Sequence, residues 1–312
     1  MTETTRNILA QRGPKNRVDP WRAYTQFAEV EREASGALES FSTLLLTNRE
    51  CSFTCAMCDL WKNTLDEATP LGAIPTQIRR ALQALPPARN IKLYNSGNFF
   101  DPQAIPKADH VAIAALLADF RRVIVENHPR LTDYRCVEFA QLIQAQLEVA
   151  LGLETIHPAA LASLNKQMRL ADFDRAVDFL RSQQIDVRAF ILVKPPGLSE
   201  AEGIEWAVRS VAHALRVGAQ CCTLIPVRRG NGYVDQLIAS GAYHEPTLRS
   251  IEAAFDQALE LGAAGRIFVD LWDIGHFSRC SLCEPQRIER LRQMNSTQQL
   301  QPSITCEQCS CR

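Results

Sequence analysis

The sequence contains no apolar run near the roughly 20 residues that a membrane-spanning helix needs. Residues 1–24 have no short apolar core of the kind that a secretory signal carries. Charge of one sign is not in surplus either, because 34 Lys and Arg stand against 35 Asp and Glu. These absences argue against a membrane protein, an exported protein and a protein held to nucleic acid by global positive charge. We therefore expect a cytoplasmic protein in a reducing compartment, where its 11 cysteines would not form a disulfide framework.

Short apolar runs alternate with helical patterns along most of the chain. The runs cover residues 41–47, 90–95, 121–126, 147–154, 187–193, 221–227 and 266–272. Continuous apolar runs of this length are typical of strands that are buried on both faces of a parallel sheet. Between them, Ser199 and Glu202 form a capping-box pattern, and Gly218 and Gly262 are placed to end helices. This alternation predicts an α/β fold, a complete or partial (β/α) barrel of about six or seven parallel strands.

Three regions follow from this pattern. Residues 1–40 are expected to form an N-terminal helical extension, residues 41–275 the barrel, and residues 276–312 a cysteine-rich tail. The charged runs at 31–33 and 287–292 are interpreted as solvated faces of helices.

Three cysteines with the spacing C-x3-C-x2-C follow the first predicted strand: Cys51, Cys55 and Cys58. Three thiolates on one loop can hold three irons of a cubane and leave the fourth iron open to another ligand. A structural zinc knuckle is the alternative. It normally takes four protein ligands, whereas only three stand close together here.

The position and spacing of these cysteines, and the barrel pattern after them, resemble the radical S-adenosylmethionine (SAM) superfamily. Segments around 126–129, 152–155, 193–196 and 223–226 resemble its archaeosine-type branch and, more distantly, elongator-type proteins. The family usually has an aromatic residue before the third cysteine, where this chain has Met57. The resemblance implies a 4Fe–4S cluster whose open iron binds SAM, and a 5′-deoxyadenosyl radical that abstracts hydrogen from a substrate. It also implies a low-potential electron donor of the flavodoxin or ferredoxin type.

Polar residues at the ends of later strands are candidates for binding SAM. The resemblance places the turn 96–98 at the methionine amino group, and residues 224–226 against the adenine. Glu126 and Glu154 each end a strand, where a buried carboxylate needs a partner such as an ammonium or ribose hydroxyl group. Either could instead be a salt-bridged barrel residue, and Lys194 could neutralise the SAM carboxylate or one of them. The predicted SAM-binding residues are Ser96, Gly97, Asn98, Glu126, Glu154 and Lys194.

The tail carries a second group of cysteines. Cys280 and Cys283 form one C-x2-C pair, Cys306 and Cys309 form another, and Cys311 follows. The spacing predicts a metal site, which would hold either zinc or an auxiliary iron–sulfur cluster. His276 is a further candidate ligand.

Together these patterns predict a radical SAM enzyme that acts on an RNA base or a small molecule. Two other functions remain open from the sequence. One is a non-catalytic iron–sulfur sensor, and the other is a zinc-ribbon protein that binds RNA, although the balanced charge disfavours the latter.

Overall fold

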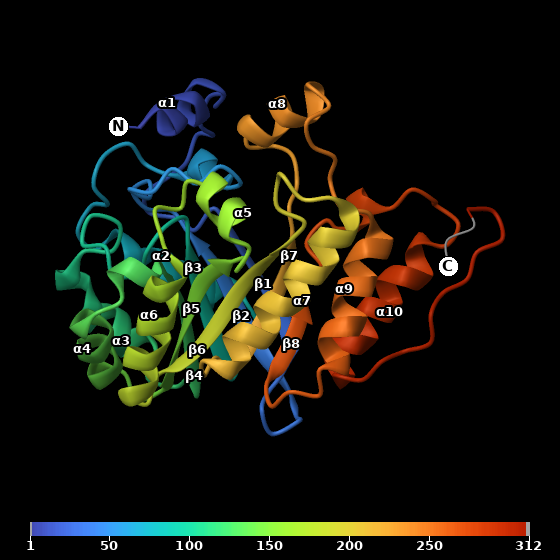
Figure 1. Ribbon diagram of the computed structural model, residues 1–312. Coiled ribbons are helices and arrows are strands. Elements are labelled where there is room, and N and C mark those ends of the chain that lie inside the picture. The colour runs from blue at the N-terminus through green and yellow to red at the C-terminus, as the bar shows by residue number, and fades with distance from the viewer. Residues whose placement is uncertain (1, 310–312) are drawn as a thin grey trace.

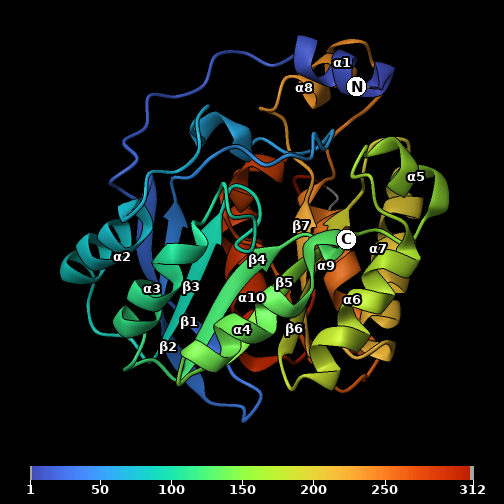
Figure 2. The same cartoon turned by 90° about the vertical axis from the view of Figure 1, so that its left-hand side faces the viewer.

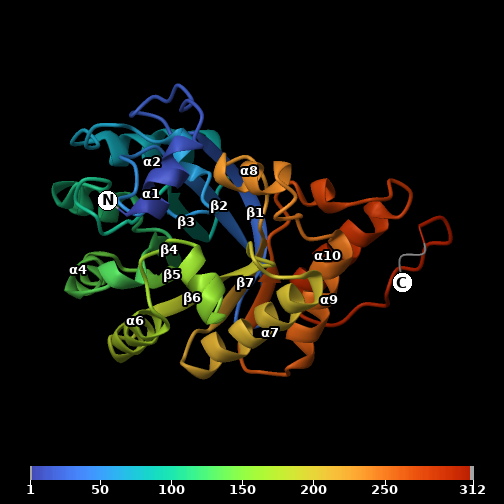
Figure 3. The same ribbon diagram turned by 45° about the horizontal axis from the view of Figure 1, so that its top comes forward.

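An eight-stranded sheet, described within residues 2–309 of a computed structural model, runs in unbroken sequence order from β1 to β8 (Figure 1). Its strands are β1 (Thr25–Arg32), β2 (Leu38–Leu46), β3 (Asn90–Asn95), β4 (Arg122–Asn127), β5 (Gln146–Glu154), β6 (Asp186–Val193), β7 (Cys221–Pro226) and β8 (Arg266–Val269). β1 pairs antiparallel with β2, and every later pairing is parallel. The sheet curls into a half barrel, seen from the end at which the parallel strands finish in Figure 3.

Helices cover the outer, convex face of this sheet (Figure 2). The α-helices are α1 (Glu3–Ala10), α2 (Ala73–Ala84), α3 (His110–Leu116), α4 (Tyr134–Leu142), α5 (Pro158–Ser163), α6 (Leu170–Ser182), α7 (Glu200–Arg216), α8 (Tyr233–Ala239), α9 (Leu248–Glu260) and α10 (Glu284–Thr297). Short 3-10 helices occupy Leu60–Asn63, Lys107–Asp109, Pro129–Leu131 and Ile274–Phe277. The main apolar core lies between sheet and helices, while Phe41, Ile124 and Ala150 form a small cluster of their own. Within residues 2–309, no helix has the length and apolar character needed to cross a bilayer.

The predicted fold class is confirmed, and so is most of its local structure. The run 90–95 coincides with β3, and the other predicted parallel strands start within about three residues of the observed ones. Ser199 and Glu202 form the predicted capping box at the start of α7. Gly218 and Gly262, with φ of 113° and 57°, follow the ends of α7 and α9.

The interpretation of residues 31–33 as a solvated helix face is wrong. Residues 25–32, within the predicted helical extension, form β1, and Glu31 is buried beside Lys92 and Arg188. Burial alone would raise the pKa of Glu31, but the charges of Arg188 and Lys92 hold it well below its ordinary value. A charged residue can therefore occupy the barrel interior because cations from β3 and β6 neutralise it.

The second charged run, at 287–292, is also only partly solvated. Arg287 and Arg290 are buried and both pair with Glu252 of α9. α10 therefore packs against α9 through ion pairs. The spacing of apolar residues in the sequence does not predict such a contact.

α10 lies where the half barrel is open, against both β1 and β8. The side-chain amide of Asn295 bonds to the backbone N–H and C=O of Val269, both at 2.9 Å. Gln298 bonds in the same two ways to Ile267, at 2.7 Å each. Two amide side chains thus replace the neighbouring strand that β8 lacks at this edge.

Candidate active site

A cavity of about 940 Å³ opens at the end of the barrel where the parallel strands finish. Its walls include the cysteine loop after β2 and residues at the ends of β3, β4, β5, β7 and β8. In Figure 1 this end faces upward, toward α1 and α8. The carboxyl ends of parallel strands meet at one edge, which is why the cavity collects residues from so many strands.

All three loop cysteines, Cys51, Cys55 and Cys58, line the cavity. Burial raises the pKa of the Cys55 thiol to about 12, and it raises the pKa of the other two thiols as well. Thiolates at these positions therefore need a compensating cation. A cluster of iron ions supplies that compensation, so the donor set fits the predicted cofactor.

Neighbouring loops fix the backbone of the cysteine loop from two sides. From the segment after α5, the Leu164 carbonyl accepts from Ala56 N at 2.9 Å, and Asn165 Nδ2 donates to the Thr54 carbonyl at 2.7 Å. From the loop after β7, Asn231 Nδ2 donates to the Ala56 carbonyl at 2.8 Å. Hydrogen bonds to its backbone atoms, rather than secondary structure of its own, therefore hold the loop in place.

The predicted turn 96–98 lies directly against the first cysteine. Asn98 Nδ2 donates to Cys51 Sγ over 3.3 Å, and a Cβ on Gly97 would lie 3.3 Å from Cys51 Cβ. Among the described side chains, Ser96 Oγ and both amide atoms of Asn95 are buried without a hydrogen-bond partner. Unpaired buried polar atoms of this kind are what a polar ligand beside the cysteines would satisfy.

The two predicted glutamates both line the cavity but have different partners. Glu126 Oε2 accepts from the Asn95 N–H at 3.0 Å, and burial raises the pKa of this carboxyl to about 8. Glu154 forms a buried ion pair with Lys166, with Oε1 and Nζ 2.5 Å apart. Burial therefore favours the neutral acid at Glu126, whereas Glu154 has the ammonium group of Lys166 as its partner.

The structure does not bring Lys194 together with the other predicted residues. Lys194 lies outside the cavity lining, and its Nζ is 2.5 Å from Glu200 Oε2 in the first turn of α7. Glu200 also accepts from Thr247 N, at the start of α9, over 2.9 Å. Lys194 therefore joins β6 to the α7–α9 pair in this structure.

Lys166 places its ammonium group in the cavity beside Glu154, and the sequence analysis did not predict it. It lies in the segment 164–169 between α5 and α6, which has no periodic pattern to draw attention to it. The same segment receives His128, whose Nε2 is 3.1 Å from the Lys166 carbonyl oxygen and whose ring stacks on Phe53 at 3.8 Å. Burial lowers the pKa of His128 to about 3, so the ring is neutral. His128 directly follows the end of β4, a position that could have marked it as a candidate.

The opposite wall of the cavity comes from β1, β7 and the segment after β8. Arg228 Nη2 and Asp270 Oδ2 are 3.0 Å apart, and the rings of Phe27 and Trp272 are 5.9 Å apart. Thr223 Oγ1 is buried there without a partner among the described residues. This wall offers a charged pair, aromatic surface and a free hydroxyl to a second molecule.

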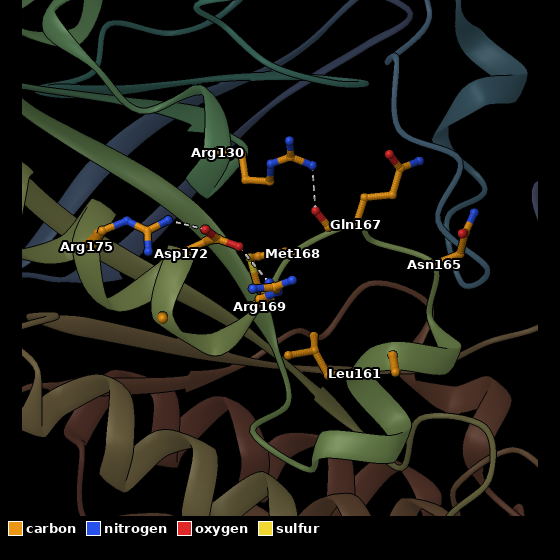
Figure 4. Close-up of a pocket in the computed structure, with 10 residues that line it drawn as sticks. Arg130, Leu161, Asn165, Gln167, Met168, Arg169, Asp172 and Arg175 are labelled. Atoms are coloured by element: carbon orange, nitrogen blue, oxygen red, sulfur yellow. Dashed lines mark hydrogen bonds and ion pairs between the residues drawn. The ribbon is translucent and has the colours of Figure 1, made fainter. Parts of the chain in front are cut away.

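A smaller hollow of about 660 Å³ lies beside the segment 164–169 (Figure 4). Its charged groups are already paired, Arg175 with Asp172 and Arg130 with the Gln167 carbonyl oxygen at 2.9 Å. We assign it no function, although its lining has a surplus of arginine over the one carboxylate, Asp172.

The four predicted tail cysteines come together at the N-terminal end of α10, where Cys283 is the N-cap: Cys280, Cys283, Cys306 and Cys309. Their Sγ atoms all lie within 4.8 Å of one another, an arrangement that could hold a metal ion. Cys311 falls outside the described residues. The alternative ligand His276 instead lies 3.0 Å from Glu245.

Comparison with known proteins gives relatives in sequence and in fold, although no family model matches the chain. The chain is 26% identical over 275 residues to "Archaeosine synthase subunit beta" of Methanosarcina acetivorans, covering 83% of this chain and 78% of that protein. A protein of the same name from Thermococcus kodakarensis is 29% identical over 151 residues, 46% of this chain and 47% of that protein. In structure, archaeal Elp3 of Methanocaldococcus infernus superposes with a TM-score of 0.53 at 12% identity. The match covers 70% of this chain and 58% of that one, and it shows the shared fold. The chain is therefore similar over most of its length to a protein named archaeosine synthase subunit beta, it shares the fold of Elp3, and its three-cysteine loop follows the first parallel strand.

Proposed function

We propose that Cys51, Cys55 and Cys58 hold a 4Fe–4S cluster and that SAM binds beside it in the 940 Å³ cavity. The observation that carries the proposal is that three cysteines on one loop line the same cavity as Asn98, Glu126 and Glu154. When bound and reduced, such a cluster supplies the electron that splits SAM into methionine and a 5′-deoxyadenosyl radical. That chemistry would serve to remove a hydrogen atom from a substrate bound in the same cavity.

Residues next to the cysteines fit the polar half of SAM. The buried and unpaired Ser96 hydroxyl and Asn95 amide lie in the turn that packs against Cys51. The Lys166–Glu154 pair offers both a cation for the carboxylate of SAM and an acceptor for its hydroxyl or amino groups. Lys166 thereby takes the role that the sequence analysis gave to Lys194.

Apolar side chains on the same cavity fit the adenine and keep water away from the reacting atoms. Ile225 and Pro226 at the end of β7 line the cavity, and Met57 lines it from the cysteine loop. The exclusion of water protects a reactive intermediate from side reactions.

The wall formed by Arg228, Asp270, Trp272 and Phe27 is the proposed place for the substrate. A hydrogen-bonding charged pair beside aromatic surface suits a planar polar ring better than an aliphatic chain. The relatives are named for archaeosine, a modified nucleoside of RNA, and this name supports an RNA nucleoside over a free small molecule.

The proposal requires a low-potential electron donor of the flavodoxin or ferredoxin type, and a cytoplasmic location stays a prediction. None of the four tail cysteines lines the 940 Å³ cavity, so the proposal gives the predicted tail metal no role in this chemistry.

Electron paramagnetic resonance of the anaerobically reconstituted and reduced protein tests whether SAM reaches the cluster. We expect one cluster signal that changes when SAM is added, and its loss from a variant in which Cys51, Cys55 and Cys58 are all alanine. A signal that SAM leaves unchanged would instead support the non-catalytic sensor.

A further inference from the structure

The spacing of the tail sulfur atoms restricts the kind of metal centre they can form. Cys280 Sγ and Cys306 Sγ are 3.9 Å apart, and Cys283 Sγ and Cys309 Sγ are 3.7 Å apart. All four sulfur atoms lie within 4.8 Å of one another. The four thus form a compact group, with one member of each C-x2-C pair facing one member of the other.

A single tetrahedral ion fits this spacing. Zinc–thiolate bonds of about 2.3 Å place the sulfur atoms of a tetrahedral site roughly 3.8 Å apart. A cubane would bind each thiolate to a different iron at a different corner, so its four sulfur atoms would have to lie farther apart than around one ion. Two disulfides do not fit either, since bonded sulfur atoms are about 2.05 Å apart.

Hydrogen bonds around the sulfur atoms connect them to the rest of the fold. Arg287 of α10 donates through Nε to Cys283 Sγ at 3.4 Å and through Nη2 to the Ile304 carbonyl at 3.0 Å. The same guanidinium group pairs with Glu252 of α9. A donor from an outer residue to a ligating thiolate is common in structural metal sites, where it offsets the negative charge of four thiolates.

A second arginine attaches the segment between the two cysteine pairs. Arg290 donates to the Gln301 carbonyl at 2.8 Å and to the Pro302 carbonyl at 2.9 Å. Its guanidinium also contacts Asp256 of α9 at 2.8 Å. The chain from α10 to Cys309 is therefore fastened at both ends, by Arg290 near its start and by the cysteines near its finish.

We propose that Cys280, Cys283, Cys306 and Cys309 bind one four-coordinate zinc ion. The ion is structural, because all four positions are taken by protein sulfur and none of the four cysteines lines the 940 Å³ cavity. Bound zinc joins the N-terminal end of α10 to the segment that follows the helix, and so supports the helix that covers the open edge of the half barrel. This inference does not depend on the proposed function.

The decisive sample is the full chain carrying Cys51→Ala, Cys55→Ala and Cys58→Ala, because any remaining metal then belongs to the tail. Elemental analysis should give one zinc and no iron per chain, both as purified and after treatment with iron and sulfide. X-ray absorption at the zinc edge should give a shell of four sulfur atoms at about 2.3 Å. Iron with acid-labile sulfide, a single iron, or cysteines recovered as disulfides would each overturn the zinc assignment.

A second pair of variants tests the ligands by residue. Cys283→Ala with Cys306→Ala should lose the zinc, whereas Cys136→Ala, a buried cysteine of α4, should keep it. Full zinc content in the double variant would overturn the assignment. If the double variant does not fold, the metal analysis of the loop variant still decides the question. The zinc analysis of the variant without Cys51, Cys55 and Cys58 and the paramagnetic-resonance test of the cluster have independent outcomes. Failure of one proposal therefore leaves the other standing.

Discussion

At the scale of single residues, the cavity is built from side chains at the ends of different strands. Ser96, Gly97, Asn98, Glu126 and Glu154 follow or end strands, and all of them line the cavity. Lys194 also follows a strand end, yet its Nζ turns toward α7. Lys166 could not be predicted because it lies in an irregular segment, and its ion pair with Glu154 exists only once the chain has folded.

Glu126 gives a prediction about protons. Its pKa of about 8 lies above its ordinary value of 4.5, so before SAM binds the carboxyl is mostly protonated at pH 7. Hydrogen bonds donated by bound SAM favour the ionised form, so the pKa falls and a proton leaves on binding. Calorimetry at pH 7 in buffers of different ionisation enthalpy should show release of up to about one proton. Glu126→Gln should abolish the release and Glu67→Gln, an exposed control, should not. Equal release by wild type and Glu126→Gln would contradict this role.

Gly152 gives a prediction about the ion pair. A Cβ at this position would collide with Glu154 Oε1 and Lys166 Nζ, which are the ends of flexible side chains. Gly152→Ala should therefore separate the pair without unfolding the protein, and weaken SAM binding by about tenfold, or about 1.4 kcal/mol. Gly13→Ala is the matched control, since nothing lies within 4 Å of its Cβ. Binding would be measured by equilibrium dialysis, and unchanged affinity in Gly152→Ala would argue against SAM contacting this pair.

At the scale of elements, apolar runs located the parallel strands, while charged elements were misread. β1 carries Glu29, Glu31 and Arg32, and its position beside β2 depends on partners distant in sequence, such as Arg188. The position of α10 also depends on distant charged partners, because its buried arginines pair with Glu252 of α9. Charge patterns alone do not distinguish a solvated face from one that is neutralised after folding.

The contact of α7 with β6 depends on Gly203. A Cβ there would lie 2.7 Å from Lys194 Cβ and 2.9 Å from Lys194 Cα, so helix and strand would have to separate. Gly203→Ala should lower the free energy of unfolding by about 1–3 kcal/mol, despite the better helix propensity of alanine. Urea unfolding followed by circular dichroism measures this, with Gly13→Ala as the reference. A midpoint at or above that of the reference would show that the contact adjusts without cost.

The edge of β8 depends on Asn295. Asn295→Ala removes both hydrogen bonds to Val269 and leaves its backbone groups unpaired, at a cost of about 1–3 kcal/mol. Gln293→Ala on the exposed side of α10 should change stability by less than about 0.5 kcal/mol. The midpoints of thermal unfolding of the two variants, measured side by side, test this difference. Equal midpoints would mean that α10 does not cap this edge.

At the scale of the whole molecule, one end of the half barrel collects the chemistry and the interior below it carries a buried ion network. Arg188 contacts Glu31 and Glu148, and Lys92 and Arg266 extend the network. The alternation of strands and helices was sufficient to predict the barrel, and the cavity lies at the strand ends where such barrels place their sites. It was not sufficient to predict which charges meet inside, because that depends on the curl of the finished sheet.

The central claim is that the cysteine loop drives reductive cleavage of SAM in this cavity. The most direct measurement is the amount of 5′-deoxyadenosine formed from SAM by the anaerobically reconstituted protein after reduction with dithionite. The account predicts formation by wild type and by Cys136→Ala, and none by Cys51→Ala, Cys55→Ala or Cys58→Ala. A wild-type protein with a full cluster that neither binds SAM nor forms 5′-deoxyadenosine would contradict it.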